Sequence, residues 1–291
     1  MSPIVWLVTG CSSGFGYEFV LELLARGERV IATARQVQKL TTLEEAGAKI
    51  LRLDLADSAL QIMTAVQAAI KIYGAIDVVV NNAGYLEAGV FEGISDEKFM
   101  GQFRTNVFGT SNVTRSILPH FRSRKAGTIV VIGSAAGWQG TLGGSAYNSS
   151  KSAVAGMRIF EALQQETAHL GIRSLLVEPG RFRTQVFSPA NVCKNLCPIP
   201  DYTAATEAMD GFLAATAGNE PGDPRKAVKV IIDVVRNEGV GKDREFPARL
   251  PLGRDALEIV RKKCSDTLAL LDRWEEVIVS TDISVQGEAS S

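Results

Sequence analysis

Apolar and polar positions alternate in blocks along this chain of 291 residues. Short runs are almost continuously apolar, which is typical of strands covered on both faces. Longer stretches between them place apolar residues at helical spacing. The runs predicted to be strands are 4–9, 29–33, 50–53, 76–81, 128–134 and 173–178, and the predicted helices between them are 17–26, 58–73, 95–121 and 145–170.

This alternation of strand and helix predicts a doubly wound parallel α/β sheet with helices on both faces. A short last strand over 248–252 and closing helices over 224–237 and 255–278 complete one domain spanning residues 1–279. Residues 185–223 carry many prolines and glycines with little periodicity, so we expect a substrate-binding loop or lid there. Residues 280–291 are expected to form a disordered tail.

Composition and charge exclude several classes of function. The net charge of -1 gives no basic face, so no nucleic-acid partner is expected. The N-terminal apolar run has strand length and no charged leader, and no run approaches the roughly 18 apolar residues of a membrane span. The four cysteines are too sparse for a disulfide framework, and Cys193 and Cys197 lack nearby histidines, so no metal is expected. We expect a cytoplasmic protein with reduced thiols.

A glycine-rich turn, Gly10-Cys-Ser-Ser-Gly14-Phe-Gly16, follows the first predicted strand and opens the first helix. Glycines at such a place let the backbone approach a pyrophosphate at a helix N-terminus. The spacing departs from the G-x-G-x-x-G fingerprint, and an ordinary glycine turn is the alternative. The residues expected to hold the dinucleotide here are Gly10, Ser12, Ser13, Gly14, Phe15 and Gly16.

The end of the second predicted strand, Thr33-Ala34-Arg35, lacks the acidic residue that accepts hydrogen bonds from the ribose of NAD. An arginine there suits a ribose 2′-phosphate, because its planar fork binds phosphate through two hydrogen bonds. Ser12 adds a hydroxyl donor. Arg35 therefore predicts NADP(H) as the cofactor, although a solvated loop arginine is the alternative.

Other strand ends carry residues suited to the rest of a dinucleotide. Asp54 is placed to accept from the adenine amino group, or to cap the next turn. Pro179 and Gly180 end the sixth predicted strand beside the expected nicotinamide, and Thr184 is a donor for its carboxamide or for a phosphate. Small residues after the fourth predicted strand allow close approach to a ribose, and these are Asn82, Ala83 and Gly84.

Tyr147 and Lys151 are four residues apart, which places both side chains on one face of a helix that begins near residue 145. A phenol has a pKa of about 10, and a neighbouring cation lowers it toward a useful range. Ser134 ends an apolar run, so its hydroxyl is expected at a strand tip. Asn106 is an amide among apolar neighbours, for which backbone satisfaction is the default and holding a water is the alternative. Tyr-x-x-x-Lys alone is common in amphipathic helices, so a catalytic role for this pair depends on support from the other motifs.

Together, TGCSSGFG, NNAG, Asn106, Ser134, YNSSK and PG-x-x-x-T resemble the short-chain dehydrogenase/reductase family over nearly the whole chain. The resemblance implies a seven-stranded Rossmann-type sheet and reversible hydride transfer between a nicotinamide and a carbonyl or alcohol. It implies that Tyr147 is the acid/base and that Lys151 lowers its pKa and binds the nicotinamide ribose. It also implies that Ser134 hydrogen-bonds the substrate oxygen and that Asn106 holds a water in the proton relay.

The strand end at Arg35 resembles NADP-preferring members of that family, and the tail around 248–253 resembles longer members. Those act on apolar ketones and alcohols, as hydroxysteroid and retinol dehydrogenase-like enzymes and fungal secondary-metabolite reductases do. We therefore expect an NADP(H)-dependent oxidoreductase, a homodimer or homotetramer, acting on a small apolar carbonyl or alcohol. The alternatives are an NADP-binding regulator or scaffold without turnover, and imine reduction on the same fold. Phe182, Phe187 and Tyr202 are expected either to line the apolar pocket or to pack under the loop.

Overall fold

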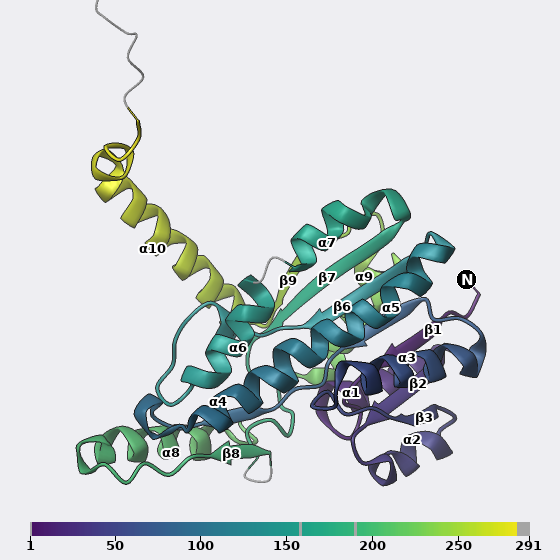
Figure 1. Ribbon diagram of the computed structural model, residues 1–291, viewed down its shortest axis with the longest axis horizontal. Helices are drawn as coiled ribbons and strands as arrows, with labels where there is room; N and C mark the ends of the chain where they lie inside the picture. The colour runs from purple at the N-terminus through teal and green to yellow at the C-terminus, as the bar shows by residue number, and fades with distance from the viewer. Residues whose placement is uncertain (1, 157–158, 189–190, 284–291) are drawn as a thin grey trace, which may run out of the picture.

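A single parallel sheet of seven strands organises the protein (Figure 1). The computed structural model describes residues 2–156, 159–188 and 191–283. The strand order is β3-β2-β1-β4-β6-β7-β9, which confirms the predicted doubly wound fold. The strands are β1 Val5–Val8, β2 Arg29–Ala34, β3 Lys49–Arg52, β4 Val78–Asn81, β6 Gly127–Ile132, β7 Ile172–Pro179 and β9 Arg249–Leu252.

The sheet has its topological switch at β1, which pairs with β2 on one side and β4 on the other. Leu7 lies opposite Ile31 in β2 and opposite Val79 in β4. The chain moves outward in both directions from this point, and ligands of such sheets bind outside the carboxyl ends of the strands at the switch. The glycine turn, Arg35, Asn82 and Gly180 each follow a strand at this edge.

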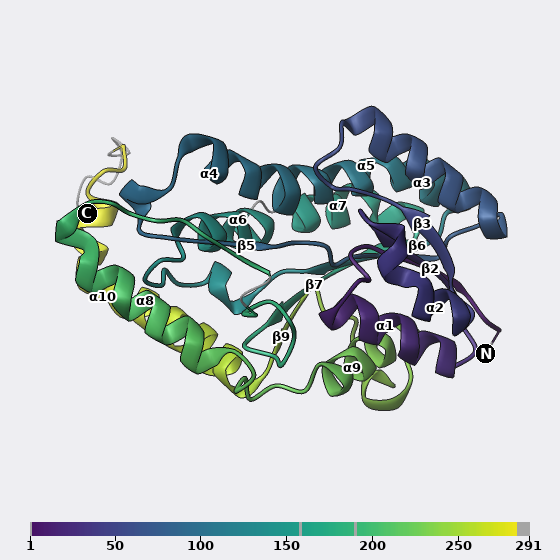
Figure 2. The ribbon, with the colours of Figure 1, turned by 90° about the horizontal axis from the view of Figure 1, so that it is seen from below.

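Helices cover both faces of the sheet (Figure 2). Leu7 belongs to the apolar core on one face, whereas its neighbours Trp6 and Val8 belong to the core on the other. Because both faces are buried, the strand sequences are continuously apolar. One layer holds α3 Ala59–Tyr73, α5 Thr110–Arg124, α6 Ser145–Gly156 and α7 Ile159–Thr167, and the other holds α1 Gly14–Ala25, α2 Thr41–Glu45 and α9 Pro224–Arg236.

Two predicted helices differ in detail from the structure. The predicted helix over 95–121 consists of α4 Asp96–Phe103, a π-helical turn η3 Arg104–Gly109, and α5. The predicted helix over 145–170 is divided into α6 and α7, followed by the short 3-10 helix Ala168–Leu170. Residues 157 and 158, between α6 and α7, lie outside the described residues.

The expectation of little regular structure over 185–223 is wrong. The segment contains β8 Val192–Lys194, which pairs in parallel with β5 Leu86–Ala88, and the helix α8 Thr203–Thr216. Met209, Leu213 and Thr216 are the buried residues of α8, at the spacing of one helical face. We call β5, β8 and α8 together the α8 lobe.

The last helix, α10 Arg254–Val279, leaves the body of the protein after its first turns (Figure 1). The predicted tail over 280–291 begins with a turn at 280–282, and residues 284–291 lie outside the described residues. Among residues 2–156, 159–188 and 191–283, no helix combines the length and the apolar character that crossing a membrane requires.

Candidate active site

Tyr147 and Lys151 lie one turn apart in α6, as their spacing predicts. The Lys151 Nζ lies 5.9 Å from the centroid of the Tyr147 ring. Lys151 is 7% exposed, and its Nζ donates a hydrogen bond of 2.9 Å to the carbonyl oxygen of Ile132, the last residue of β6. This bond ties the face of α6 that carries Tyr147 and Lys151 to the carboxyl end of a central strand.

Ser134 faces Tyr147 from the loop that follows β6. The strand ends at Ile132, two residues earlier than predicted, and Ser134 caps the 3-10 helix η4 Ala135–Gly137. Its Oγ accepts a hydrogen bond of 3.1 Å from the Ala136 amide. The Ser134 and Tyr147 side chains are also hydrogen-bonded to each other. The structure therefore brings the serine, tyrosine and lysine of the predicted set together.

The protonation of the pair follows from its burial. Burial raises the pKa of Tyr147, and the hydrogen bond with Ser134 opposes this shift. Burial lowers the pKa of Lys151 to about 8. The pKa of Tyr147 thus moves in the opposite direction to the lowering expected from the sequence. The reason is that burial removes the phenol from water, and this effect is larger than that of the hydrogen bond with Ser134.

Asn106 lies in the π-helical turn η3 and is 3% exposed. Its Oδ1 accepts from the Tyr85 amide at 3.1 Å. Its Nδ2 donates to the Tyr85 carbonyl at 3.2 Å and to the Ser150 Oγ in α6 at 3.0 Å. Such turns recur at functional sites. The observed contacts are structural, joining the segment after Gly84 to α6, and the role of Asn106 in holding a water stays a prediction.

The glycine turn is closely packed between the ends of three strands. Gly10 has a φ of 71°, and a Cβ there would lie 2.7 Å from the Ala83 Cα. A Cβ on Gly16 would overlap the Gly10 carbonyl oxygen. Gly14 has a φ of 58°, and a Cβ there would lie 3.2 Å from the Cβ of Thr184, beyond β7. The turn after β1 therefore meets the segments after β4 and β7, as a site that spans a dinucleotide requires.

The start of α1 has the properties of an anion-binding site. Ser12 and Ser13 are exposed, and Ser13 makes no side-chain cap to the helix. The first turn of α1 contains no acidic residue. Phe15 packs against Phe182, with ring centroids 5.2 Å apart. Amides at an uncapped helix N-terminus suit a pyrophosphate, so the residues at the turn fit the predicted cofactor.

Asn82, Asp54 and Arg35 have different surroundings. The Asn82 Nδ2 donates to the Thr9 carbonyl at 2.8 Å, which joins the end of β4 to the glycine turn. The Asp54 Oδ1 accepts from the Ala56 amide at 3.0 Å, which is the turn-forming alternative, and its contact with adenine stays a prediction. Arg35 is exposed directly after β2.

The positive charge of Arg35 acts on one residue of the α8 lobe. Burial raises the pKa of the Cys193 thiol in β8, the charge of Glu87 adds to this, and the positive charges of Lys98 and Arg35 oppose it. The 2′-phosphate contact itself stays a prediction.

Pro179 ends β7 next to the last strand, and Gly180 follows it directly. Pro179 is the last residue of β7 and lies opposite Leu252 in β9. The Gly180 amide donates to the Leu252 carbonyl at 2.9 Å, and a Cβ on Gly180 would overlap the Asp255 carboxylate. Only glycine fits this close packing. The Thr184 Oγ1 accepts from the Val186 amide at 3.4 Å, within the segment that leads to the α8 lobe.

An apolar cluster of the α8 lobe packs against Tyr147. Tyr147, Val186 and Phe187 contact its buried side chains, which are Leu86, Ala88, Val192, Met209 and Leu213. Of the three aromatic residues predicted to line an apolar pocket, Phe187 alone belongs to this cluster. Tyr202 donates from its hydroxyl to Glu92 at 2.7 Å, and Phe182 packs on Phe15. The helical spacing of Met209 and Leu213 was the available sequence signal for the cluster.

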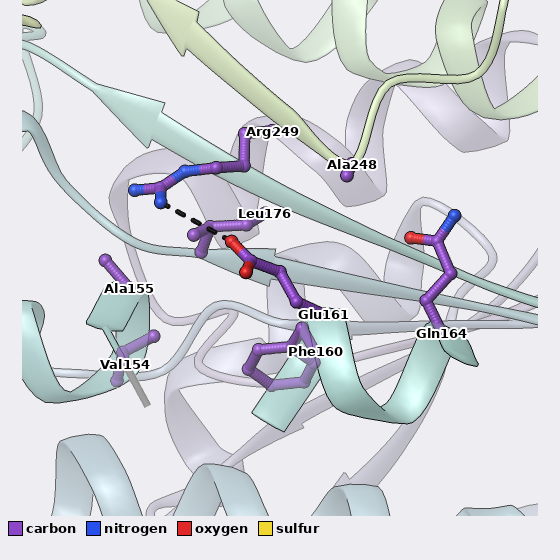
Figure 3. A pocket seen from close by; sticks show the side chains of 8 residues that line it. All are labelled: Val154, Ala155, Phe160, Glu161, Gln164, Leu176, Ala248 and Arg249. Atoms are coloured by element: carbon purple, nitrogen blue, oxygen red, sulfur yellow. Dashed lines mark ion pairs between the residues drawn. The ribbon is translucent and has the colours of Figure 1, made fainter. Parts of the chain in front are cut away.

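A buried carboxylate behind the serine loop was missed by sequence reasoning. Glu178 in β7 is 0% exposed and accepts from the Trp138 Nε1 at 2.7 Å. Arg249 in β9 donates to both of its carboxylate oxygens, at 3.1 and 2.6 Å. Arg249 also approaches Glu161 of α7 at 3.7 Å, beside a cavity of about 10 Å³ (Figure 3). This network joins the loop after Ser134 to β7, β9 and α7.

The comparisons with known proteins agree with this fold and site. The short chain dehydrogenase family model matches residues 4–193, and the chain belongs to the short-chain dehydrogenase/reductase family of oxidoreductases. Oxidoreductase BOA17 of Botryotinia fuckeliana is 32% identical over 95% of this chain and 98% of its own length. Retinol dehydrogenase 8 of Bos taurus is 35% identical over 80% of this chain and 78% of its own length.

Solved structures include a short-chain dehydrogenase from Streptomyces avermitilis, with a TM-score of 0.85 and 34% identity over 97% of this chain and 99% of that one. Two more distant structures share the fold and contain different cofactors. One, from Burkholderia phymatum, is a complex with NAD (TM-score 0.77, 22% identity, covering 92% of this chain and 95% of that one). The other is a serine dehydrogenase with NADP+ (TM-score 0.68, 24% identity, covering 86% and 94%).

Proposed function

We propose that this protein is an NADP(H)-dependent oxidoreductase that interconverts a ketone or aldehyde and an alcohol on a small apolar molecule. The observation that carries the proposal is the position of Tyr147. Its side chain is hydrogen-bonded with Ser134 on one side and packs against the apolar cluster of the α8 lobe on the other. A proton donor next to an apolar wall suits an apolar substrate with one polar reacting oxygen.

The roles of the side chains follow from their protonation. The nicotinamide, when bound, supplies or accepts the hydride at the carbonyl carbon. In the direction of reduction, the raised pKa keeps Tyr147 protonated at neutral pH, so its hydroxyl is ready to donate a proton to the substrate oxygen. The Ser134 hydroxyl hydrogen-bonds the same oxygen and orients it. Lys151, protonated below about pH 8, stabilises the phenolate that proton donation leaves behind.

NADP(H) is proposed as the cofactor on the strength of the end of β2. Thr33 and Ala34 are buried and uncharged, and the exposed Arg35 follows them. An acidic side chain at this place would repel a 2′-phosphate, whereas a guanidinium attracts it. The residues proposed to hold the rest of the cofactor are the glycine turn with Ser12, Ser13 and Phe15, and Asp54, Asn82, Ala83, Gly84, Tyr147, Lys151, Pro179, Gly180 and Thr184.

The test is a panel of apolar ketones, aldehydes, secondary alcohols and imines, followed through NADPH absorbance. Tyr147→Phe should lower turnover of every accepted carbonyl by roughly 10²–10⁴-fold, the usual contribution of a general acid. Its affinity for NADPH should change little, because the phenyl ring remains in place. Tyr73→Phe is the matched control, since Tyr73 ends α3 on the helix layer and belongs to no predicted site.

Three results would change the assignment. Wild-type turnover in Tyr147→Phe would remove the tyrosine from the chemistry. Tight NADPH binding with no turnover across the whole panel would favour a cofactor-binding regulator. Turnover of imines alone would keep the site and change the reacting atom from oxygen to nitrogen.

A further inference from the structure

Most of α10 is exposed to solvent. Ala256 is the one buried residue of this 26-residue helix, and every residue from 261 to 283 is exposed. A helix of this length spans about 39 Å. Figure 1 shows it projecting away from both the sheet and the α8 lobe. Eight of its large apolar side chains are exposed, including Leu268, Leu271 and Trp274. An apolar face of this size on a single helix marks an interaction surface.

The apolar positions of α10 recur at the spacing of a two-helix coiled coil. Leu257, Cys264, Leu271 and Ile278 are seven residues apart, and Val260, Thr267 and Trp274 lie at the second position of each heptad. Leu271, Trp274 and Ile278 are 46%, 50% and 47% exposed. A repeat with two core positions per heptad forms the seam between paired helices. This face therefore fits another helix with the same repeat.

The charges beside this seam determine the orientation of such a partner. Arg261 and Lys263 flank the seam in the first half of the exposed helix, and Glu275 flanks it in the second half. A parallel pair of identical helices would place like charges side by side. An antiparallel pair would place the basic flank of one copy against the acidic flank of the other, which is favourable.

We propose that α10 pairs in antiparallel orientation with α10 of a second copy of this chain, centred near residue 269. In this register Cys264 lies opposite Trp274 of the second copy, and Val260 lies opposite Ile278. Arg261 then flanks the seam next to Glu275 of the second copy. The two bodies stand at opposite ends of the paired helices, so both active sites remain open. This surface is independent of the proposed catalytic function.

A lipid surface is the other occupant that an amphipathic helix suits, and the charge of α10 argues against it. Helices that lie on membranes are rich in Lys and Arg on the polar face. In contrast, α10 carries six acidic and five basic residues. The acidic residues dominate the end farthest from the body, which would approach a membrane first.

The first test measures the molar mass of the full chain by sedimentation across a wide range of concentrations. The wild type should dimerise, and Leu271→Glu should weaken the dimer at least tenfold by burying a charge in the seam. Leu60→Glu is the matched control, because Leu60 is 66% exposed on α3, and it should not change the dimer. A wild-type monomer at every concentration, or equal weakening by both substitutions, would overturn the proposal.

The second test determines orientation through disulfide cross-linking. Cys193 and Cys197 are first replaced by serine, since they are the other cysteines that are not buried. Adding Trp274→Cys should then give a covalent dimer under mild oxidation, because the new thiol lies opposite Cys264 of the second copy. The same chain with Cys264→Ser should give none. A dimer linked through Cys264 before Trp274 is changed would indicate the parallel register and overturn the proposal, as would a monomer that binds phosphatidylcholine vesicles through α10.

Discussion

The carboxyl edge of the sheet and the α8 lobe both border Tyr147, but they are built in different ways. At the edge, polar side chains are held by backbone groups of central elements: Lys151 bonds to the end of β6, and Asn106 bonds to the segment after β4. In the lobe, two three-residue strands and one helix meet through apolar contacts. Directional bonds hold atoms in place, whereas apolar contacts accept many shapes.

On the proposed function, this difference in construction assigns the reaction chemistry to the carboxyl edge and the choice of substrate to the α8 lobe. Proton transfer requires atoms placed within fractions of an ångström, and the edge supplies such placement by packing buried donors against a rigid sheet. Recognition of an apolar molecule requires mainly a wall of suitable shape, and on the proposed function the apolar cluster of the lobe is that wall. We therefore expect substitutions at the edge to change the rate of the reaction, and substitutions in the lobe to change which substrates enter it.

Lys151 gives the largest expected effect after Tyr147 itself. Burial lowers its pKa to about 8, so Lys151 loses its proton, and its stabilisation of the phenolate, as the pH rises through that value. The rate of reduction should therefore be high below pH 8 and fall above it. Lys151→Met should lower the rate roughly 10²-fold or more and remove this part of the pH profile.

Lys151→Arg separates charge from position in the same experiment. A guanidinium stays protonated far above pH 8, so any activity that remains should persist to higher pH than in the wild type. Lys71→Met, an exposed lysine of α3, is the control and should leave the profile unchanged. If the alkaline fall stayed in place in Lys151→Met, another group would be responsible for it.

The same division explains how much the sequence revealed. Strands buried on both faces produce continuous apolar runs, so each predicted strand overlaps an observed one. The glycine turn and the Tyr147–Lys151 spacing depend on neighbours in the chain, and both were found. The hydrogen-bond acceptor of Lys151 is a backbone carbonyl 19 residues away. Every residue has a backbone carbonyl, so the sequence could not predict which one Lys151 contacts. The ion pair between Glu178 and Arg249 joins residues 71 positions apart, so spacing could not suggest it.

The sequence did not predict the elements of the α8 lobe, and the reasons lie in the local sequence. The prolines and glycines that flank α8 made the whole of 185–223 look irregular, although its alanine-rich centre has strong helix propensity. β5 and β8 have three residues each, which is too short for a periodic pattern. The π-helical turn that carries Asn106 adds one residue per turn inside an otherwise continuous helical pattern. The sequence signal was therefore weakest where the structure depends on tertiary contacts.

Substitution of Arg35 is expected to change the affinity for the cofactor and to leave the rate of the chemical step unchanged. Arg35→Asp should raise the KM for NADPH by roughly 10–100-fold, which corresponds to the 1.5–3 kcal/mol of a charge-assisted hydrogen bond. The KM for NADH should change little, because NADH lacks the 2′-phosphate. Arg122→Asp, an exposed arginine of α5, is the control for net charge. Equal effects on the two cofactors would show that Arg35 does not distinguish them.

Substitution of Phe187 tests the role of the α8 lobe in substrate binding, and its expected effect is the smallest of those predicted. It is partly buried, contacts the apolar cluster beside Tyr147, and packs edge-on against Phe212 with ring centroids 6.5 Å apart. Phe187→Ala should raise the KM of bulky apolar substrates by roughly tenfold, near the lower value for lost hydrophobic contacts in a binding site. The kcat should stay within a few-fold, because the bond between Ser134 and Tyr147 does not involve Phe187.

Phe91→Ala is the control for Phe187→Ala, since Phe91 is 72% exposed and packs on Phe99 outside the apolar cluster. It should change neither constant. If Phe187→Ala instead lowered kcat as much as it raised KM, then the lobe would help to place the reacting atoms. In that case the edge and the lobe would act as one unit, and the weak, short-stranded contacts of the lobe would have to become rigid when substrate binds.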